Sequence, residues 1–524
     1  MARQIFLALA LLALALAAAL AWTAPGGWIA LALVVPVIAL GLQDMSQRTH
    51  AIRRNFPVVG RLRYLFEAVR PEMHQYFIET DQNGRPFSRE QRSLVYQRAK
   101  GELDTVPFGT RQEVYASGYM WIDHSLAPRH LEHEPRVTIG GPACTRPYSA
   151  SLLNISAMSF GSLSPAAIRA LNGGARDGGF YHNTGEGGVS PYHLEPGGDL
   201  VWQIGTGYFG CRDAAGRFDP ESFAALATRD AIKMIEVKLS QGAKPGHGGI
   251  LPARKLTPEI AAIRRVPFGQ DVLSPPAHTA FSTPLELLRF VQRLRELSGG
   301  KPVGFKLCLG RPEHFLAICK AMRETGVTPD FITVDGGEGG TGAAPLEFSN
   351  AVGWPLFDAL AYVHGALVGV GLRDRITVIA SGRVIDGFDL AVRIALGADL
   401  CNSARGMMFA LGCIQALRCN NNTCPAGVAT QDPRLYGGLV VADKRQRVAN
   451  FQRATVRAFL DLLGAAGLAA PHELQPSMIR RRVDGTATRT LAELHGSVLP
   501  GALLGDRIPE RYADAWARAR TDAF

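Results

Sequence analysis

The chain has 524 residues, of which 47% are hydrophobic and only 19% are charged. Its 57 glycines and 32 prolines follow no fixed period, so the composition excludes a disordered chain, a collagen and a coiled coil. The formal net charge of +10 comes partly from an arginine-rich stretch near the N-terminus, and no basic stripe with interleaved aromatic residues indicates a nucleic-acid partner. We therefore expect a well-packed globular protein with an unusual N-terminal end.

Residues 5–42 contain no Asp, Glu, Lys or Arg. The motif TAPGG at 23–27 divides this stretch into the 18-residue run 5–22 and the shorter run 28–42. A membrane-spanning helix needs about 17 to 25 apolar residues. The stretch therefore predicts a transmembrane helical hairpin, which we assign to a two-helix membrane anchor at 1–45.

Basic residues flank both ends of this hairpin. Arg3 precedes it, and it is followed by Arg48, Arg53, Arg54, Arg61 and Arg63. The positive-inside rule then places both ends in the cytoplasm, so we expect an inner-membrane protein whose catalytic domain faces the cytoplasm. A cleaved signal peptide is the alternative. Against export, the eight cysteines are too few and too clustered for an extracellular disulfide framework.

Residues 46–149 are polar, and we interpret them as a juxtamembrane and wrapping or lid segment that is rich in helix. Beyond them, short apolar runs alternate with helical patterns, which is typical of βα units around a parallel sheet. Eight runs predict strands, at 152–158, 179–183, 200–204, 231–238, 302–308, 330–335, 376–381 and 398–403. They predict an α/β protein with a (β/α)8 TIM barrel at 150–465, followed by a C-terminal helical extension at 466–524.

Two features of the connections add detail. Ser164 and Thr283 each precede a proline, which predicts capped helix starts, and Glu286 would complete a capping box with Thr283. Residues 239–282, between the fourth and fifth strands, are too many for an ordinary βα loop. We expect this insertion to shape the active site.

The C-terminal ends of the strands carry the chemistry in this fold. Two otherwise apolar strands end in Lys238 and Lys306, and a buried ammonium is costly unless an anion pairs with it. Polar ends also occur in purely structural barrels, because strand ends meet water. We nevertheless expect an anionic cofactor or substrate here, beside the polar strand-end residues Ser156, Ser159, Asn183, Thr184, Gln203, Lys238, Lys306, Asp335, Ser381 and Ser403.

Glycine-rich turns follow several of these strands, at 184–188, 335–342 and 381–383. None is a Walker loop, but barrels often hold a phosphate after their last two strands, where Ser381, Gly382, Arg383, Ser403 and Arg405 lie. FMN fits such a site, because a lysine beside its ring can stabilise the negative charge that develops on reduction.

Three cysteines, Cys413, Cys419 and Cys424, lie within twelve residues, and a proline follows the last of them. Three thiolates at short spacing suit an iron–sulfur cluster better than tetrahedral zinc, which needs a fourth ligand nearby. The alternative is that they are free core cysteines. Three ligands without a fourth predict a 3Fe-4S cluster, an electron relay that must lie near the flavin.

Six motifs resemble the FMN-binding synthase domain of glutamate synthase, in order and spacing, over about residues 150–465. They are AMSFGSLS (157–164), NTGEGG (183–188), KLSQGAKPGHGGILP (238–252), SPPAH (274–278), DGGEGGTGAAP (335–345) and GCIQALRCNNNTCPAGVATQ (412–431). The resemblance implies a (β/α)8 barrel that carries FMN and a 3Fe-4S cluster. It also implies the family's reaction, in which ammonia condenses with 2-oxoglutarate and reduced FMN delivers hydride to 2-iminoglutarate.

The resemblance also implies roles for individual residues. The three cysteines would ligate the cluster, and Lys238 or Lys306 would receive the oxo-acid carboxylate and polarise the imine. The expected catalytic residues are Lys238, Lys306, Gln203, Glu186 and Asp335. The expected cofactor-binding residues are Ala157, Met158, Ser159, Thr184, Gln203, Lys306, Gly336, Gly337, Ser381, Gly382, Arg383, Ser403 and Arg405.

The resemblance does not extend to every part of the family's enzymes. No cysteine precedes Cys144, so we expect no cysteine-nucleophile glutaminase domain and ammonia from another source. No NAD(P)H-binding fingerprint is present, so we expect an external electron donor such as a ferredoxin or a reductase subunit. His247 stands where the family motif carries glutamate, which leaves the substrate open. The alternatives are a related flavin-dependent amino acid or amine oxidoreductase and a non-catalytic electron-transfer subunit.

Overall fold

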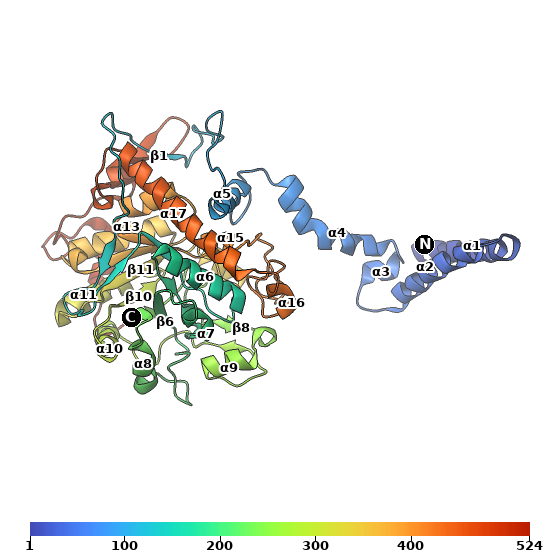
Figure 1. Cartoon of the computed structure of the whole chain (residues 1–524), viewed down its shortest axis with the longest axis horizontal. Helices are drawn as coiled ribbons and strands as arrows, with labels where there is room; N and C mark the ends of the chain where they lie inside the picture. The colour runs from blue at the N-terminus through green and yellow to red at the C-terminus, as the bar shows by residue number, and fades with distance from the viewer. The chain divides into compact units, whose positions relative to one another are not determined.

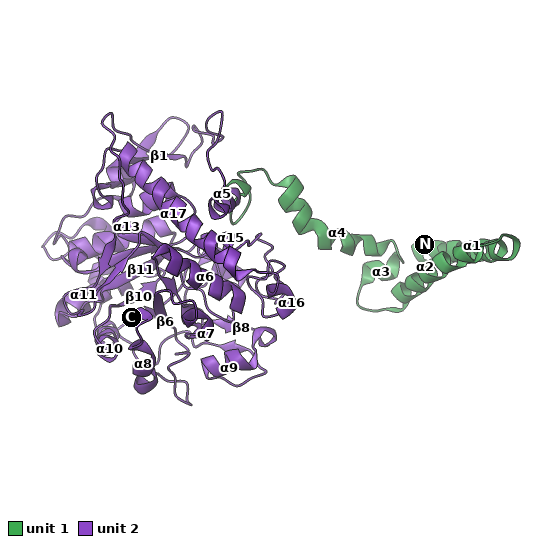
Figure 2. Cartoon of the chain, viewed as in Figure 1, with its two compact units in different colours: residues 1–90 green, residues 91–524 purple.

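The computed structural model describes all 524 residues, which form two compact units at Met1–Glu90 and Gln91–Phe524 (Figure 2). The first unit begins with two apolar helices, α1 (Ala2–Thr23) and α2 (Trp28–Ser46), which pack side by side (Figure 1). This confirms the predicted pair of helices. Both are long and apolar enough to cross a membrane, and a signal sequence passes the same test.

Hydrogen bonds tie the open end of this hairpin to the segment that follows it. At the start of α1, Arg3 Nε donates to the carbonyl of Arg54 at 2.7 Å. At the end of α2, the buried carboxylate of Asp44 accepts hydrogen bonds from Val58 N–H and Arg61 Nε. These bonds hold both helix ends beside α3 (Ala51–Asn55) and the start of α4 (Gly60–Met73), which runs into the π-helix η1 (His74–Ile78).

The second unit is built around a closed barrel of eight parallel strands (Figure 1). Each strand pairs with the next along the chain, and the last pairs with the first. All eight lie within the predicted runs, which confirms the (β/α)8 fold. The strands are β4 (Leu153–Ile155), β5 (His182–Asn183), β6 (Leu200–Ile204), β7 (Ile232–Lys238), β10 (Val303–Leu307), β11 (Phe331–Asp335), β12 (Thr377–Ser381) and β13 (Leu400–Ser403).

Helices cover the outside of the barrel (Figure 1). Ser164 and Thr283 cap their helices as predicted, by accepting hydrogen bonds from Ala167 N–H and Glu286 N–H. The predicted capping box is wrong in one respect, because the Glu286 carboxylate accepts its hydrogen bond from Ser282 N–H, one residue before the cap. The helices from residue 89 onward are α5 (Arg89–Lys100), α6 (Pro165–Gly178), α7 (Pro191–Leu194), α8 (Pro220–Ala227), α9 (Pro258–Arg264), α10 (Pro284–Leu297), α11 (Pro312–Thr325), α12 (Leu346–Ala351), α13 (Leu356–Gly369), α14 (Gly387–Ala395), α15 (Arg405–Ala410), α16 (Pro433–Tyr436), α17 (Val441–Ala465), α18 (Leu491–His495) and α19 (Glu510–Arg518).

The two ends of the barrel differ in chemistry. A hairpin of β2 (Val137–Ile139) and β3 (Tyr148–Ala150) packs against apolar side chains such as Phe331 and Leu400. Both are the first residues of their strands, so this apolar cluster closes the N-terminal end of the barrel. The polar strand ends are therefore left at the opposite, C-terminal end.

A small antiparallel sheet joins the segments that precede and follow the barrel. β1 (Met120–Ile122) pairs with β14 (Ile479–Arg482), which pairs with β15 (Thr488–Thr490). The wrapping segment and the C-terminal extension, both expected to be helical, therefore also contain strands. Another two-stranded pair, β8 (Ile250–Leu251) with β9 (Val272–Leu273), lies in the 239–282 insertion, and the 3-10 helix η3 (Ala253–Lys255) follows β8.

Candidate active site

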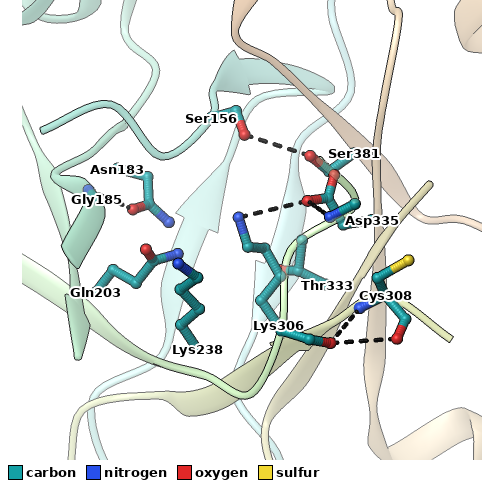
Figure 3. Close-up of polar contacts among 12 residues, drawn as sticks. Ser156, Asn183, Gly185, Gln203, Lys238, Lys306, Cys308, Thr333, Asp335 and Ser381 are labelled. Carbon is teal, nitrogen blue, oxygen red and sulfur yellow. Dashed lines mark hydrogen bonds and ion pairs between the residues drawn. The ribbon is translucent and has the colours of Figure 1, made fainter. Parts of the chain in front are cut away.

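Two lysines lie side by side at the C-terminal end of the barrel. Lys238 is the last residue of β7, and its Cα is paired with that of Lys306 in the parallel ladder. The two side chains extend in the same direction from neighbouring strands (Figure 3) and are only 7% and 5% exposed. Because two buried like charges repel, each requires an anion close by.

Each ammonium meets a carboxylate from another loop. Lys238 Nζ donates to Glu186 Oε1 at 2.7 Å, and Lys306 Nζ lies 3.7 Å from Asp335 Oδ2 (Figure 3 shows the second pair). Asp335 Oδ2 also accepts a hydrogen bond from Gly242 N–H at 2.9 Å, which ties the insertion to the end of β11. The chain therefore supplies one carboxylate for each lysine, in addition to any anion that a ligand brings.

This arrangement makes Lys238 a weaker base than an exposed lysine. Burial lowers the pKa of its ammonium, Glu186 opposes that change, and Lys306 adds to it, so the pKa stays below its ordinary value. Burial raises the pKa of Glu186, but Lys238 and, after it, Lys244 and Arg264 bring it below its usual range. Glu186 is therefore ionised at neutral pH, and Lys238 releases a proton more readily than a lysine in water does.

Deeper in the barrel lies a buried carboxylate that was not predicted from the sequence. Glu236, 1% exposed, accepts hydrogen bonds from Asn183 Nδ2 at 2.8 Å, Gln203 Nε2 at 2.7 Å and Thr333 Oγ1 at 2.6 Å. A signal was available, because Glu236 precedes Lys238 by two positions and such residues share one face of a strand. The network fixes the amide of Gln203, which was expected to contact the flavin ring or the substrate.

The loops after β4 and β5 approach each other backbone to backbone. Met158 N–H donates to the carbonyl of Asn183 at 3.2 Å, and Thr184 Oγ1 accepts a hydrogen bond from β6. Gly185 has a φ of +64°, and a Cβ there would lie 2.9 Å from the backbone nitrogen of Ser159. Only glycine fits this contact. The structure thus brings together the residues predicted to approach the flavin, Ala157, Met158, Ser159 and Thr184.

The ends of β11, β12 and β13 form the other side of the mouth. Ser381 Oγ lies 3.3 Å from Ser156 Oγ across the mouth (Figure 3). Arg405 Nη2 donates to the carbonyl of Glu338 at 2.9 Å, and burial together with the nearby Arg383 guanidinium lowers the pKa of Arg405 to about 10. The predicted residues on this side are Gly336, Gly337, Ser381, Gly382, Arg383, Ser403 and Arg405.

A small pocket, with room for about one water molecule, opens beside Lys238 and Glu186. Residues 239–249 of the insertion, including Gln241 and His247, supply much of its wall. Gln241 Nε2, in the wall of the pocket, is buried without a hydrogen-bond partner in the chain, and so is Ser274 Oγ beside Gly249. Unpaired buried polar groups at such a site are satisfied by a bound ligand or an ordered water.

The three cysteines of the sequence motif lie on the loop that follows α15 and form no disulfides. Burial, aided by the neighbouring thiols of Cys419 and Cys424, raises the pKa of Cys413 to about 12. Tyr96 of α5 donates a hydrogen bond to the carbonyl of Cys413 at 2.6 Å. No three His, Cys, Asp or Glu side chains are arranged to hold one metal ion.

Comparison with known proteins identifies the family. A family model for the conserved region in glutamate synthase matches residues 135–469, which is more than half of the chain. The chain belongs to the glutamate synthase family.

Relatives within the glutamate synthase family cover the chain to different extents. The glutamate synthase large subunit-like protein YerD of Bacillus subtilis is 38% identical over an alignment 500 residues long, which covers 87% of this chain and 95% of that protein. An archaeal glutamate synthase (NADPH) of Methanocaldococcus jannaschii is 36% identical over 342 residues, 65% of this chain and 64% of that protein. The chain thus spans less than two thirds of the archaeal relative. A solved structure of mandelate oxidase with (S)-2-phenylpropionate aligns with this chain at a TM-score of 0.41 and 15% sequence identity. The alignment covers 78% of this chain and 99% of that one, and it adds nothing to the family assignment.

The residues present fit the two cofactors of a glutamate synthase domain. Positive groups at the mouth outnumber carboxylates, with Lys238, Lys244, Lys306, Arg264, Arg383 and Arg405 against Glu186, Asp335 and Glu338. The phosphate of FMN balances such an excess. The thiols of Cys413, Cys419 and Cys424 lie near enough to interact electrostatically, as the ligands of one cluster would.

Proposed function

We propose that this protein is a membrane-tethered FMN and iron–sulfur oxidoreductase of the glutamate synthase type. Its reaction is the reductive amination of 2-oxoglutarate, with ammonia that this chain does not generate. The observation that carries the proposal is the pair Lys238 and Lys306, two buried lysines in register on neighbouring strands, each held by a carboxylate. This pair can bind an acidic substrate and keep a proton donor beside it.

The side chains at the mouth would divide the work of the reaction. Bound FMN would supply a hydride to the imine carbon. Lys306 would bind a substrate carboxylate, and Lys238, whose pKa is lowered, would donate the proton that the imine nitrogen needs. Glu186 would orient Lys238 through their 2.7 Å hydrogen bond, and Asp335 would hold Lys306. Gln241, whose Nε2 is unpaired in the adjoining pocket, would contact the rest of the oxo acid.

Two groups of residues would hold the cofactors. Ala157, Met158, Ser159 and Thr184 would approach the flavin, while Ser381, Gly382, Arg383, Ser403 and Arg405 would bind its phosphate. Cys413, Cys419 and Cys424 would ligate a 3Fe-4S cluster. Electrons would come from an external donor such as a ferredoxin or a reductase subunit.

The N-terminal hairpin would tether the enzyme to the inner membrane. Its two helices have the length and hydropathy of membrane spans, and both ends of the hairpin lie at the segment that carries the arginines 53, 54 and 61. The positive-inside rule places that segment and the catalytic domain in the cytoplasm.

The test is a half-reaction of the purified full-length protein. The flavin is reduced under anaerobic conditions and mixed with 2-oxoglutarate and ammonium, while flavin absorbance is followed. We expect reoxidation with ammonium and none when glutamine replaces it. If the flavin is not reoxidised with ammonium present, the protein does not form glutamate. If a different 2-oxo acid reoxidises the flavin, the protein is a related amino acid oxidoreductase instead.

A further inference from the structure

Lys255 lies between the two loops that the proposed cofactors require. It is the last residue of η3 in the insertion and is 3% exposed. Its Nζ donates hydrogen bonds to the carbonyls of Ser162 at 2.7 Å, Cys419 at 3.3 Å and Ala429 at 3.3 Å. Ser162 belongs to the loop after β4, and Cys419 to the cysteine loop. One ammonium therefore joins the loop expected to contact the flavin to the loop expected to hold the cluster.

No carboxylate neutralises this ammonium. Its three hydrogen-bond acceptors are neutral carbonyl groups, and the ionisable groups with which it interacts are the thiols of Cys419 and Cys424 and the cation Arg264. Arg264 is itself buried, and Glu186 is the carboxylate that offsets its charge, so Arg264 brings no counter-charge to Lys255. A buried cation without a counter-charge strongly opposes folding. The fold thus keeps positive charge here that the protein chain alone does not balance.

We propose that an iron–sulfur cluster on the three cysteines supplies the counter-charge and that Lys255 raises its reduction potential. This inference rests on the proposed function. A cluster with three thiolate ligands is negatively charged, and its negative charge grows by one unit when it takes up an electron. A fixed positive charge beside it therefore stabilises the reduced form more than the oxidised form.

The chain contains a matched control for this lysine. Lys301 is 2% exposed, and its Nζ donates to the carbonyls of Ala227 and Arg229, both at 2.6 Å. It precedes β10, so it lies at the end of the barrel away from the mouth. Replacing either lysine with glutamine removes a buried charge but keeps a hydrogen-bond donor. Lys255→Arg, in contrast, keeps the charge.

The experiment is a redox titration of the full-length protein, loaded anaerobically with iron and sulfide and monitored by electron paramagnetic resonance. We expect a more negative potential in Lys255→Gln and the wild-type potential in Lys301→Gln and Lys255→Arg. An unchanged potential in Lys255→Gln, an equal shift in both glutamine variants, or the same shift in Lys255→Arg overturns the inference.

A second readout applies where Lys255→Gln does not hold a cluster. Iron and sulfide content is then compared after identical loading. Loss in Lys255→Gln with full content in Lys301→Gln supports the inference, whereas loss in both variants overturns it. If the wild-type protein takes up no cluster, both the proposed cofactor and this inference are wrong. The outcomes above, in contrast, concern Lys255 alone, so the two kinds of failure can be told apart.

Discussion

Glu236 and Lys238 occupy alternate positions of β7, and both side chains enter the barrel. Glu236 accepts hydrogen bonds from three side chains in the interior, whereas Lys238 meets Glu186 at the mouth. One strand therefore supplies a carboxylate that organises the interior and an ammonium that serves the site. The two contributions can be separated by mutation.

Glu236→Leu should destabilise the protein. The change leaves the amide groups of Asn183 and Gln203 and the hydroxyl of Thr333 buried without their acceptor, and we expect a loss of about 3 kcal/mol in the free energy of unfolding. Urea unfolding measures it. The exposed Glu324 provides the control, since Glu324→Leu should leave stability within about 0.5 kcal/mol. Equal stability of the two variants would show that the network contributes nothing.

Lys238→Met should stop turnover without removing the flavin. We expect a decrease of about 100-fold or more in the rate of flavin reoxidation by 2-oxoglutarate and ammonium, because the proton donor is lost. Lys233 lies on the same strand but pairs with Asp199 and Asp230, so Lys233→Met should react at the wild-type rate. Normal flavin content with unchanged activity in Lys238→Met would instead favour a non-catalytic electron-transfer subunit.

Stability should fall below about pH 6.5 because of a buried histidine pair. The rings of His182 and His193 lie 5.2 Å apart, and burial lowers the pKa of both below the ordinary value of 6.5, that of His193 to about 4. Above pH 6.5 both are neutral whether the chain is folded or unfolded. Below it the unfolded chain binds protons that the folded chain excludes, so folding is disfavoured as the pH falls, by about 2 kcal/mol at pH 5 for His193.

His182→Phe tests this pH dependence. Neither ring nitrogen of His182 has a hydrogen-bond partner, so the variant should be as stable as the wild type at pH 7.5 and should lose less stability at pH 5. Urea unfolding at both pH values measures the difference. The exposed His133 serves as control, since His133→Phe should keep the wild-type pH profile. A wild-type profile in His182→Phe would contradict the assignment.

The purified protein should be yellow-brown and should give the resonance signal of an oxidised 3Fe-4S centre. Cys419→Ser should abolish that signal and leave the flavin spectrum intact. Cys144 provides a control, because its thiol donates to the carbonyl of Gly300, before β10 and away from the cysteine loop. Cys144→Ser should keep the signal. A signal that persists in Cys419→Ser would exclude the proposed ligand.

The N-terminal hairpin should be retained in the mature protein. Intact-mass measurement of protein from the membrane fraction should give the full chain, with residues 1–46 present. Leu12→Arg, in the middle of α1, should release the protein from alkali-washed membranes, because a charge at the centre of a span disfavours insertion by about 3 kcal/mol. Leu65→Arg, outside both spans, should not. Cleavage within residues 1–46 would identify a signal peptide.

The barrel could be predicted from the sequence because each strand is a buried apolar run bounded by turn residues, and β6 coincides with its predicted run. The lysine pair was visible for the same reason, as a charge at the end of such a run. Glu186 and Asp335 were expected as catalytic partners from the family resemblance. Which lysine each one meets could not be predicted, because Glu186 lies 52 positions from Lys238 and folding alone brings them together. Glu236 was not predicted as a site residue, because it lies inside a strand and the prediction considered only the strand ends.

The pairing of β1 with β14 links the chain before the barrel to the chain after it. The region matched by the family model, residues 135–469, contains neither strand. A protein shortened to that region would lack both partners, and trimming only the C-terminal part would leave β1 with an open edge of unpaired N–H and C=O groups, which invites aggregation. The smallest soluble catalytic fragment should therefore begin before Met120 and extend beyond Thr490.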